Sequence, residues 1–155
     1  MSAHVVFALR HRALSEGLAR ELSILMGSRQ DPPYRFSIAP EGAEPLDPID
    51  GFVPDVVVID GKRARQVLLQ LSSGSQALRV VVYTQFEQLS LAQALVQLGA
   101  TAVVNKSSDQ STMLEALDAC VQGRQYVDAS FRSVADQVLL RRDVPELLSG
   151  FGSLD

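Results

Sequence analysis

The chain has 155 residues, and its 14 Lys and Arg against 18 Asp and Glu give a formal net charge of -4 at pH 7. A hydrophobic fraction of 46% and a charged fraction of 21% fit one globular domain and exclude disordered, collagen-like and coiled-coil chains. One cysteine, Cys120, and two histidines exclude a disulfide framework and multi-cysteine zinc sites. The acidic balance argues against nucleic-acid binding by these residues alone, because phosphate neutralisation needs a basic surface.

The apolar run near the start of the chain does not predict a membrane segment. Ala3–Leu9 is too short for a bilayer, and Arg10, His11 and Arg12 follow it directly. No other run approaches the roughly 20 apolar residues that a transmembrane helix needs. We therefore expect a cytoplasmic protein.

Five short runs, most of them rich in β-branched residues, predict strands. They are His4–Leu9, Tyr34–Ala39, Pro54–Asp60, Leu78–Tyr83 and Thr101–Asn105. The continuous apolar runs among them suit strands that are buried on both faces, as in a parallel sheet, whereas Tyr34–Ala39 alternates like an edge strand.

Apolar residues at helical spacing fill most of the intervals between these strands. The stripes are Leu14, Leu18, Leu22 and Leu25; Val67, Leu68 and Leu71; Leu91, Leu95 and Leu98, ended by Gly99; and Leu114, Leu117 and Val121, opened by Ser108 or Asp109 and ended by Gly123. A last amphipathic helix is predicted over Asp128–Leu140. Three prolines and two glycines in Pro40–Val53 predict that the second crossover helix is short or missing.

Strands that alternate with helices predict an α/β fold with a doubly wound, five-stranded parallel sheet. In such a sheet, functional groups gather beyond the carboxyl ends of the strands. Reading off those ends gives Leu9 and Arg10, then Asp60, then Thr84, then Lys106. An acid, a hydroxyl and an ammonium that end three separate strands form a specific arrangement.

These motifs resemble the receiver domain of two-component response regulators of the NarL type. PDVVVID resembles the family's third strand, which ends in the phospho-accepting aspartate and matches Asp60. VVVYT resembles the fourth strand, whose terminal hydroxyl residue matches Thr84, and GATAVVNKSS resembles the fifth-strand region, whose lysine matches Lys106. Ser107 stands where other subfamilies have proline, which favours the NarL type.

The resemblance implies a flavodoxin-like (βα)5 fold with a short or missing second helix and an extra C-terminal helix. Residues 1–125 would be the receiver domain, and residues 126–155 a helix and linker leading to an effector domain outside this chain. It also implies control of transcription, a homodimer, a histidine kinase or other protein partner, and DNA contact only through a missing helix-turn-helix domain.

The chain departs from the family at the acidic pair that coordinates Mg²⁺, since Leu9 and Arg10 occupy those positions. Val103 stands where the family has its aromatic switch residue, and Gly61–Arg65 replaces a loop that normally ends in Pro-Gly. The formal charges of Asp60, Arg10 and Lys106 sum to +1 before any metal arrives, whereas Mg²⁺ needs oxygen ligands. We therefore expect weak or absent Mg²⁺ binding, no cofactor, and slow or absent phosphorylation.

Two surfaces are candidates for contacts with other molecules. The helix Gln88–Leu98 has no charged residue, and its second apolar stripe, Leu89, Ala92 and Val96, predicts a partner interface. Arg10, Arg63 and Lys106 are candidate anion contacts.

Two alternative functions stay open. One is a protein–protein adaptor, such as the receiver-like module of pilus-assembly ATPases, and the other is a flavodoxin-like domain that binds a small molecule or anion. An enzyme is least expected, because no nucleophile–base pair or metal-ligand spacing rises above chance.

Overall fold

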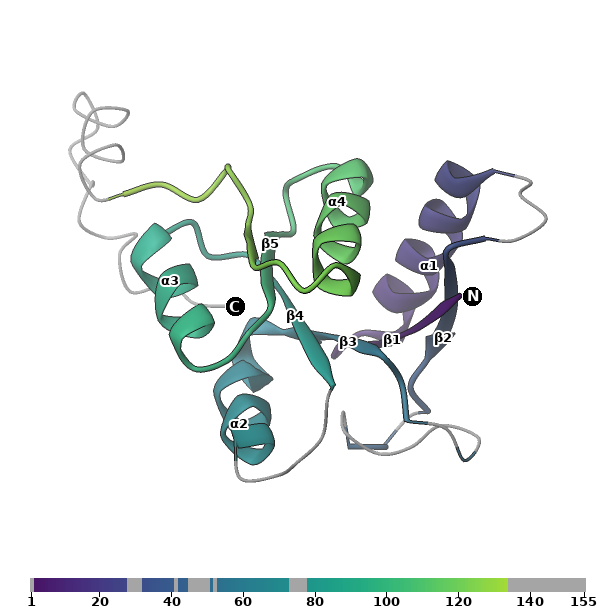
Figure 1. Ribbon diagram of the computed structural model, residues 1–155, viewed down its shortest axis with the longest axis horizontal. Helices are drawn as coiled ribbons and strands as arrows, with labels where there is room; N and C mark the ends of the chain where they lie inside the picture. The colour runs from purple at the N-terminus through teal and green to yellow at the C-terminus, as the bar shows by residue number, and fades with distance from the viewer. Residues whose placement is uncertain are drawn as a thin grey trace.

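The computed structural model describes residues 2–27, 32–40, 42–44, 51, 53–72 and 78–133. The described residues form a central parallel sheet of six strands in the order β2-β1-β3-β4-β5-β6. Figure 1 labels β1 to β5 of this sheet. The strands are β1 (Ala3–Ala8), β2 (Tyr34–Ile38), β3 (Val56–Asp60), β4 (Arg79–Thr84), β5 (Ala102–Asn105) and β6 (Tyr126–Val127). The predicted flavodoxin-like α/β fold is confirmed, and its five strands lie within two residues of their expected bounds.

Within the described residues, four helices cover the two faces of the sheet (Figure 1): α1 (Arg12–Met26), α2 (Gly61–Ser72), α3 (Leu89–Gln97) and α4 (Gln110–Val121). One face forms a core with α1 and α4 around residues such as Phe7, Leu22 and Leu117. The other face packs against α2 and α3, with Ile59 and Leu68 at its centre. Because β3 and β4 contribute to both cores, their sequences are continuously apolar rather than alternating.

The buried face of α1 differs from the predicted leucine stripe. Leu18 and Leu22 are buried as expected, but Leu25 is 52% exposed and Met26 takes its place in the core. An α-helix has 3.6 residues per turn. Met26, four residues after Leu22, therefore stays closer to the sheet-facing side than Leu25, three residues after it.

α4 begins and ends as its sequence predicts. The Asp109 side chain accepts a hydrogen bond from the backbone N–H of Thr112, which satisfies one of the unpaired donors of the first turn. Gly123 follows the helix with a φ of 76°, a conformation that glycine adopts without strain.

Residues after Asp60 were interpreted from the sequence as a loop, and this interpretation is wrong. α2 begins at Gly61, directly after β3, so Lys62, Arg63 and Arg65 lie in its first turns. Between β2 and β3, the described residues 39, 40, 42–44, 51 and 53–55 contain no helix, in line with the proline-rich sequence.

The predicted start of a C-terminal helix near Asp128 is also wrong. The chain there adds β6 to the sheet edge beside β5, and Arg132 then forms a parallel bridge with Gln88. Residues 128–133 are not helical, and the rest of the predicted helix lies outside the described residues. Within the part of the chain that is described, no helix is long and apolar enough to cross a membrane.

Candidate functional site

Asp60 ends β3 at the carboxyl edge of the sheet, and its carboxylate is buried. One oxygen accepts a hydrogen bond from Lys106 Nζ at 3.0 Å, and the other accepts from the backbone N–H of Arg10. The strands β1, β3 and β5 thus bring three residues together that lie 50 and 46 positions apart in the sequence. The carboxylate is satisfied on both oxygens by groups of the chain itself.

The turn after β5 positions Lys106. Its backbone N–H donates to the carbonyl of Thr84 at 2.8 Å, which ties this turn to the end of β4. Asn105 is buried beside it, donates to the Phe86 carbonyl at 3.0 Å and accepts from Ser107. Thr84 is fully buried at the end of β4, so the structure brings Asp60, Thr84 and Lys106 to one edge, as the sequence indicates.

The aromatic ring of Tyr83 adds to the setting of this lysine. Lys106 Nζ lies 5.9 Å from the centroid of the ring, a distance at which the ring's electron-rich face attracts a cation. Burial, together with the negative charge of Glu21, raises the pKa of the Tyr83 hydroxyl. Tyr83 is therefore neutral near pH 7 and adds no charge beside the pair.

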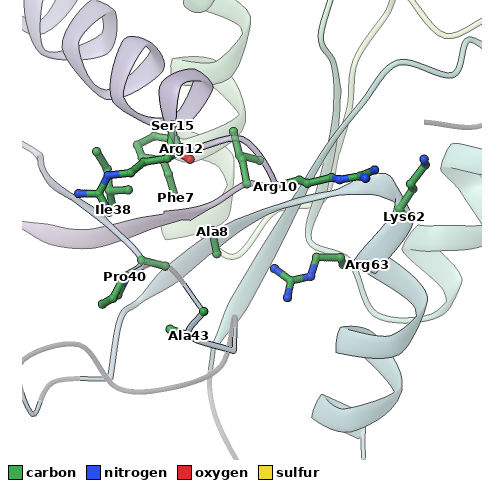
Figure 2. A pocket seen from close by; sticks show the side chains of 13 residues that line it. Phe7, Ala8, Arg10, Arg12, Ser15, Ile38, Pro40, Ala43, Lys62 and Arg63 are labelled. Atoms are coloured by element: carbon green, nitrogen blue, oxygen red, sulfur yellow. The ribbon is translucent and has the colours of Figure 1, made fainter.

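Leu9 and Arg10 do not supply metal ligands at this edge. Leu9 is buried in the core, and the exposed side chain of Arg10 extends toward Lys62, as Figure 2 shows. The contact of Arg10 with Asp60 is made by its main-chain N–H rather than by its guanidinium group. Among the described residues, no three His, Cys, Asp or Glu side chains gather where a metal ion could be held.

A second feature of this edge is a pocket of about 550 Å³ between β1, β2 and the start of α2. Of the three candidate anion contacts, Arg10 and Arg63 line this pocket and Lys106 does not. Its walls also include Arg12, Ser15 and Lys62, which the sequence did not single out as site residues (Figure 2). These come from segments that are far apart in the chain, so only the parallel topology could have indicated that they meet.

The predicted interface on α3 requires correction. Ala92 is fully buried against the sheet, and Leu89 and Val96 are partly buried against the same core. Leu91 and Leu95 also pack partly against this core, and together with Leu98 they line a groove of about 740 Å³ between α3 and α2. Because apolar residues lie on both sides of Ala92, the sequence gave no means of deciding which of them is most buried.

Asp128 is a structural residue that the sequence reasoning missed. Its buried carboxylate accepts hydrogen bonds from the Asn105 N–H at 2.9 Å, the Ser108 hydroxyl at 2.6 Å and the Ser130 N–H at 3.0 Å. These bonds connect the residue after β6 to the turn that carries Lys106. No local pattern marks the two distant contacts, because Asn105 and Ser108 lie 23 and 20 positions away.

No protein-family model matches the chain. Solved structures, however, match its fold with TM-scores near 0.6. The receiver domain of a NarL response regulator from Mycobacterium tuberculosis is 26% identical, has a TM-score of 0.64, and is matched over 79% of this chain and 98% of that one. A LuxR-family two-component response regulator from Aurantimonas sp. SI85-9A1 is 22% identical, with a TM-score of 0.64 and coverage of 92% and 99%.

A third match is the isolated receiver domain of RcsB from Salmonella enterica serovar Typhimurium, 14% identical with a TM-score of 0.64. The alignment covers 90% of this chain and 99% of that domain. At this level of identity the match concerns the fold alone. Together with the strand-end residues Asp60, Thr84 and Lys106, these similarities confirm what the sequence resembles: the chain has the fold of a NarL-type response-regulator receiver domain.

Proposed function

We propose that the chain is a receiver module that regulates transcription without Mg²⁺-dependent phosphorylation of Asp60. The observation that carries the proposal is the environment of that carboxylate. Its two oxygens accept from Lys106 and from the Arg10 N–H, and the neighbouring side chains at the end of β1 are an apolar Leu9 and an outward Arg10.

The chemistry of phosphoryl transfer explains why this arrangement disfavours the reaction. Charge that develops on the equatorial oxygens needs a cation that also holds the phosphoryl donor, and Mg²⁺ is normally held by carboxylates. Because Leu9 and Arg10 replace the acidic pair of the family, a divalent ion would have to displace Lys106 from Asp60 and would gain few other ligands. We therefore assign no Mg²⁺ cofactor and no enzymatic activity to the chain.

Intact-mass measurement after incubation with acetyl phosphate, with and without Mg²⁺, tests this proposal. The expected result is no phosphoryl adduct in either condition, with an Asp60→Asn variant indistinguishable from the wild type. An adduct that requires both Mg²⁺ and Asp60 would restore an ordinary phosphorylation switch and refute the proposal.

Output would then depend on contacts with other proteins. One structural neighbour is described as RcsB dimers bound to DNA. We propose a homodimer for this chain and assign its contact surface to the apolar side of α3, where Leu98 is 39% exposed and α3 carries no charged residue. DNA contact through a separate helix-turn-helix domain, a protein partner such as a kinase, and a cytoplasmic location stay predictions.

Sedimentation velocity over a range of concentrations tests the homodimer. Leu98→Glu should shift the protein to the monomer, because a charge would be buried in the contact. Leu25→Glu is a matched control, since Leu25 is also exposed but lies on α1. A wild-type protein that remains monomeric at every concentration, or equal effects of the two substitutions, would contradict the assignment.

A further inference from the structure

We propose that the pocket between β1, β2 and α2 binds a small organic phosphate. Its volume of about 550 Å³ falls within the range of small-molecule sites. The pocket lies at the carboxyl edge of the sheet beside β1. The strand order reverses at β1, because β2 lies on one side of it and β3 on the other. Open α/β sheets bind ligands in the crevice at such a switch point.

The charge of the pocket favours an anion. Arg10, Lys62 and Arg63 line it, and in the described part of the chain none of these three pairs with a carboxylate. A fourth cation, Arg12, is paired with Glu16 at 2.8 Å. No Asp or Glu is among the described residues of the wall, so the like charges are not offset within the pocket.

The first turns of α2 carry charge of the sign that the helix dipole disfavours. The positive end of the helix dipole favours acidic residues there, yet this helix has none in its first turn and carries Lys62, Arg63 and Arg65 instead. Residues that oppose a local preference without a compensating contact often serve function. Figure 2 shows Arg63 reaching from α2 toward Ala8 and Ala43, across the pocket.

An independent observation comes from Ser15 on α1. Its hydroxyl oxygen is buried, borders the pocket and has no hydrogen-bond partner in the described structure. A buried hydroxyl without a partner is disfavoured, because it has lost its hydrogen bonds to water. A ligand oxygen, or a water molecule held by the ligand, would supply the missing partner.

The remaining walls determine the class of anion. Phe7, Ala8, Ile38 and Pro40 provide apolar surface beside the cations, which suits an organic body rather than a bare inorganic ion. Two guanidinium forks and an ammonium match the several oxygens and double charge of a phosphate ester. Because the contacts come from side chains, the turn after β1 needs no glycine to let its backbone approach the phosphate.

Isothermal titration calorimetry at constant ionic strength tests the site, with adenosine monophosphate, adenosine and pyrophosphate as probes. Adenosine monophosphate should bind saturably with one site per chain, and adenosine at least about tenfold more weakly, because charge-assisted hydrogen bonds to the phosphate would be lost. Absence of saturable binding by adenosine monophosphate would overturn the proposal, including the case in which pyrophosphate alone binds, because the site would then take a bare inorganic ion.

Two arginines on the same helix give a matched pair of variants. Arg63 lines this pocket, whereas Arg65 lines the groove between α2 and α3. Arg63→Gln should weaken binding of adenosine monophosphate about tenfold, and Arg65→Gln should leave it unchanged. Equal weakening in both variants would mean nonspecific attraction to a basic surface and would overturn the site.

Ser15→Ala separates binding from folding. Removal of a hydroxyl without a partner should leave the Tm unchanged or raise it, while binding weakens several-fold because the ligand loses an acceptor or donor. Unchanged binding would overturn the role assigned to Ser15. These measurements do not involve Asp60 chemistry, so they can fail while the proposed phosphorylation independence holds, and the reverse.

Discussion

Two regions at the same edge of the sheet differ in whether the chain itself neutralises their charges. At the ends of β3 and β5, a buried carboxylate is matched by Lys106 and by a backbone amide. At the ends of β1 and β2 and the start of α2, four cations line an open pocket without a carboxylate among its described walls, and one of them, Arg12, is paired with Glu16. Arg10 joins the two regions, because its N–H faces Asp60 while its side chain lines the pocket.

The two regions differ in the source of the group that neutralises their buried or clustered charges. The Asp60 region is complete within the chain, so a metal ion would compete with Lys106 for the carboxylate. The pocket has positive charge that the described chain does not neutralise, and an anion from solution would do so. Stability should therefore depend on the charges of the first region and hardly on those of the second.

Lys106→Met should have the largest effect on stability. It leaves the Asp60 carboxylate buried with the Arg10 amide as its remaining donor in the described structure, and we expect a loss of roughly 2–4 kcal/mol in the free energy of unfolding. Urea denaturation measures this loss. Adding Asp60→Asn to the variant should recover part of the stability, because the uncompensated charge is removed; no recovery would contradict the account.

Asp128→Ala should have the next largest effect. Three donors, including the Asn105 N–H beside Lys106, would lose a buried acceptor, at a cost of about 1–3 kcal/mol. Urea denaturation gives the loss, and hydrogen exchange should show faster exchange at Asn105 in particular. Ser130→Ala is a control that retains the carboxylate and the backbone donor. Normal protection of Asn105 in Asp128→Ala would break the proposed link to the lysine turn.

Tyr34→Phe provides a reference outside both regions, with an expected loss of about 1 kcal/mol. The Tyr34 hydroxyl donates to Asp118 and connects β2 to α4, and burial, the hydrogen bond and the Asp118 charge raise its pKa. A raised pKa favours the neutral hydroxyl in the folded state. This contribution is complete below the ordinary tyrosine pKa of about 10 and is lost as pH rises above it.

Chemical denaturation at several pH values checks the reference. The stability difference between wild type and Tyr34→Phe should be constant from pH 7 to about pH 9 and shrink at higher pH. A difference that grows above pH 10 would mean that the ionised hydroxyl is favoured in the folded protein, contrary to its contacts.

Arg63→Gln should have the smallest effect on stability, within about 0.5 kcal/mol of the wild type in the absence of ligand. It removes a cation that has no carboxylate partner in the described structure and lies beside others of the same sign. Urea denaturation alongside Lys106→Met makes the comparison direct. A loss as large as that of Lys106→Met would erase the distinction between the two regions.

Burial within a single element was easier to predict than contacts between elements. The apolar runs that form β3 and β4 indicated a parallel sheet, and the topology alone placed Asp60, Thr84 and Lys106 at one edge. The orientation of α3 could not be predicted, because apolar residues on both sides of Ala92 pack against the same core and the helix has no charged residue to mark its exposed face.

Long-range polar contacts had no local signal. Asp128 begins the last helix that the sequence predicts, yet its carboxylate accepts from Asn105 and Ser108 at and after the end of β5, and the pairing of β6 with the sheet edge competes with a helix there. Ser15 reads as a polar position on α1 but is buried at the pocket wall. Such roles require distances between segments that a single sequence does not contain.

The most direct measurement restores the acidic pair and compares it with the wild type. Leu9→Asp combined with Arg10→Asp, with Arg10→Asp alone as a variant that keeps the buried leucine, would be incubated with acetyl phosphate and Mg²⁺ and weighed intact. Circular dichroism would establish that each variant is folded. We expect a Mg²⁺-dependent adduct on Asp60 in the variant that carries both acidic residues and none in the wild type. A wild-type protein that forms the same adduct at a comparable rate would contradict the account.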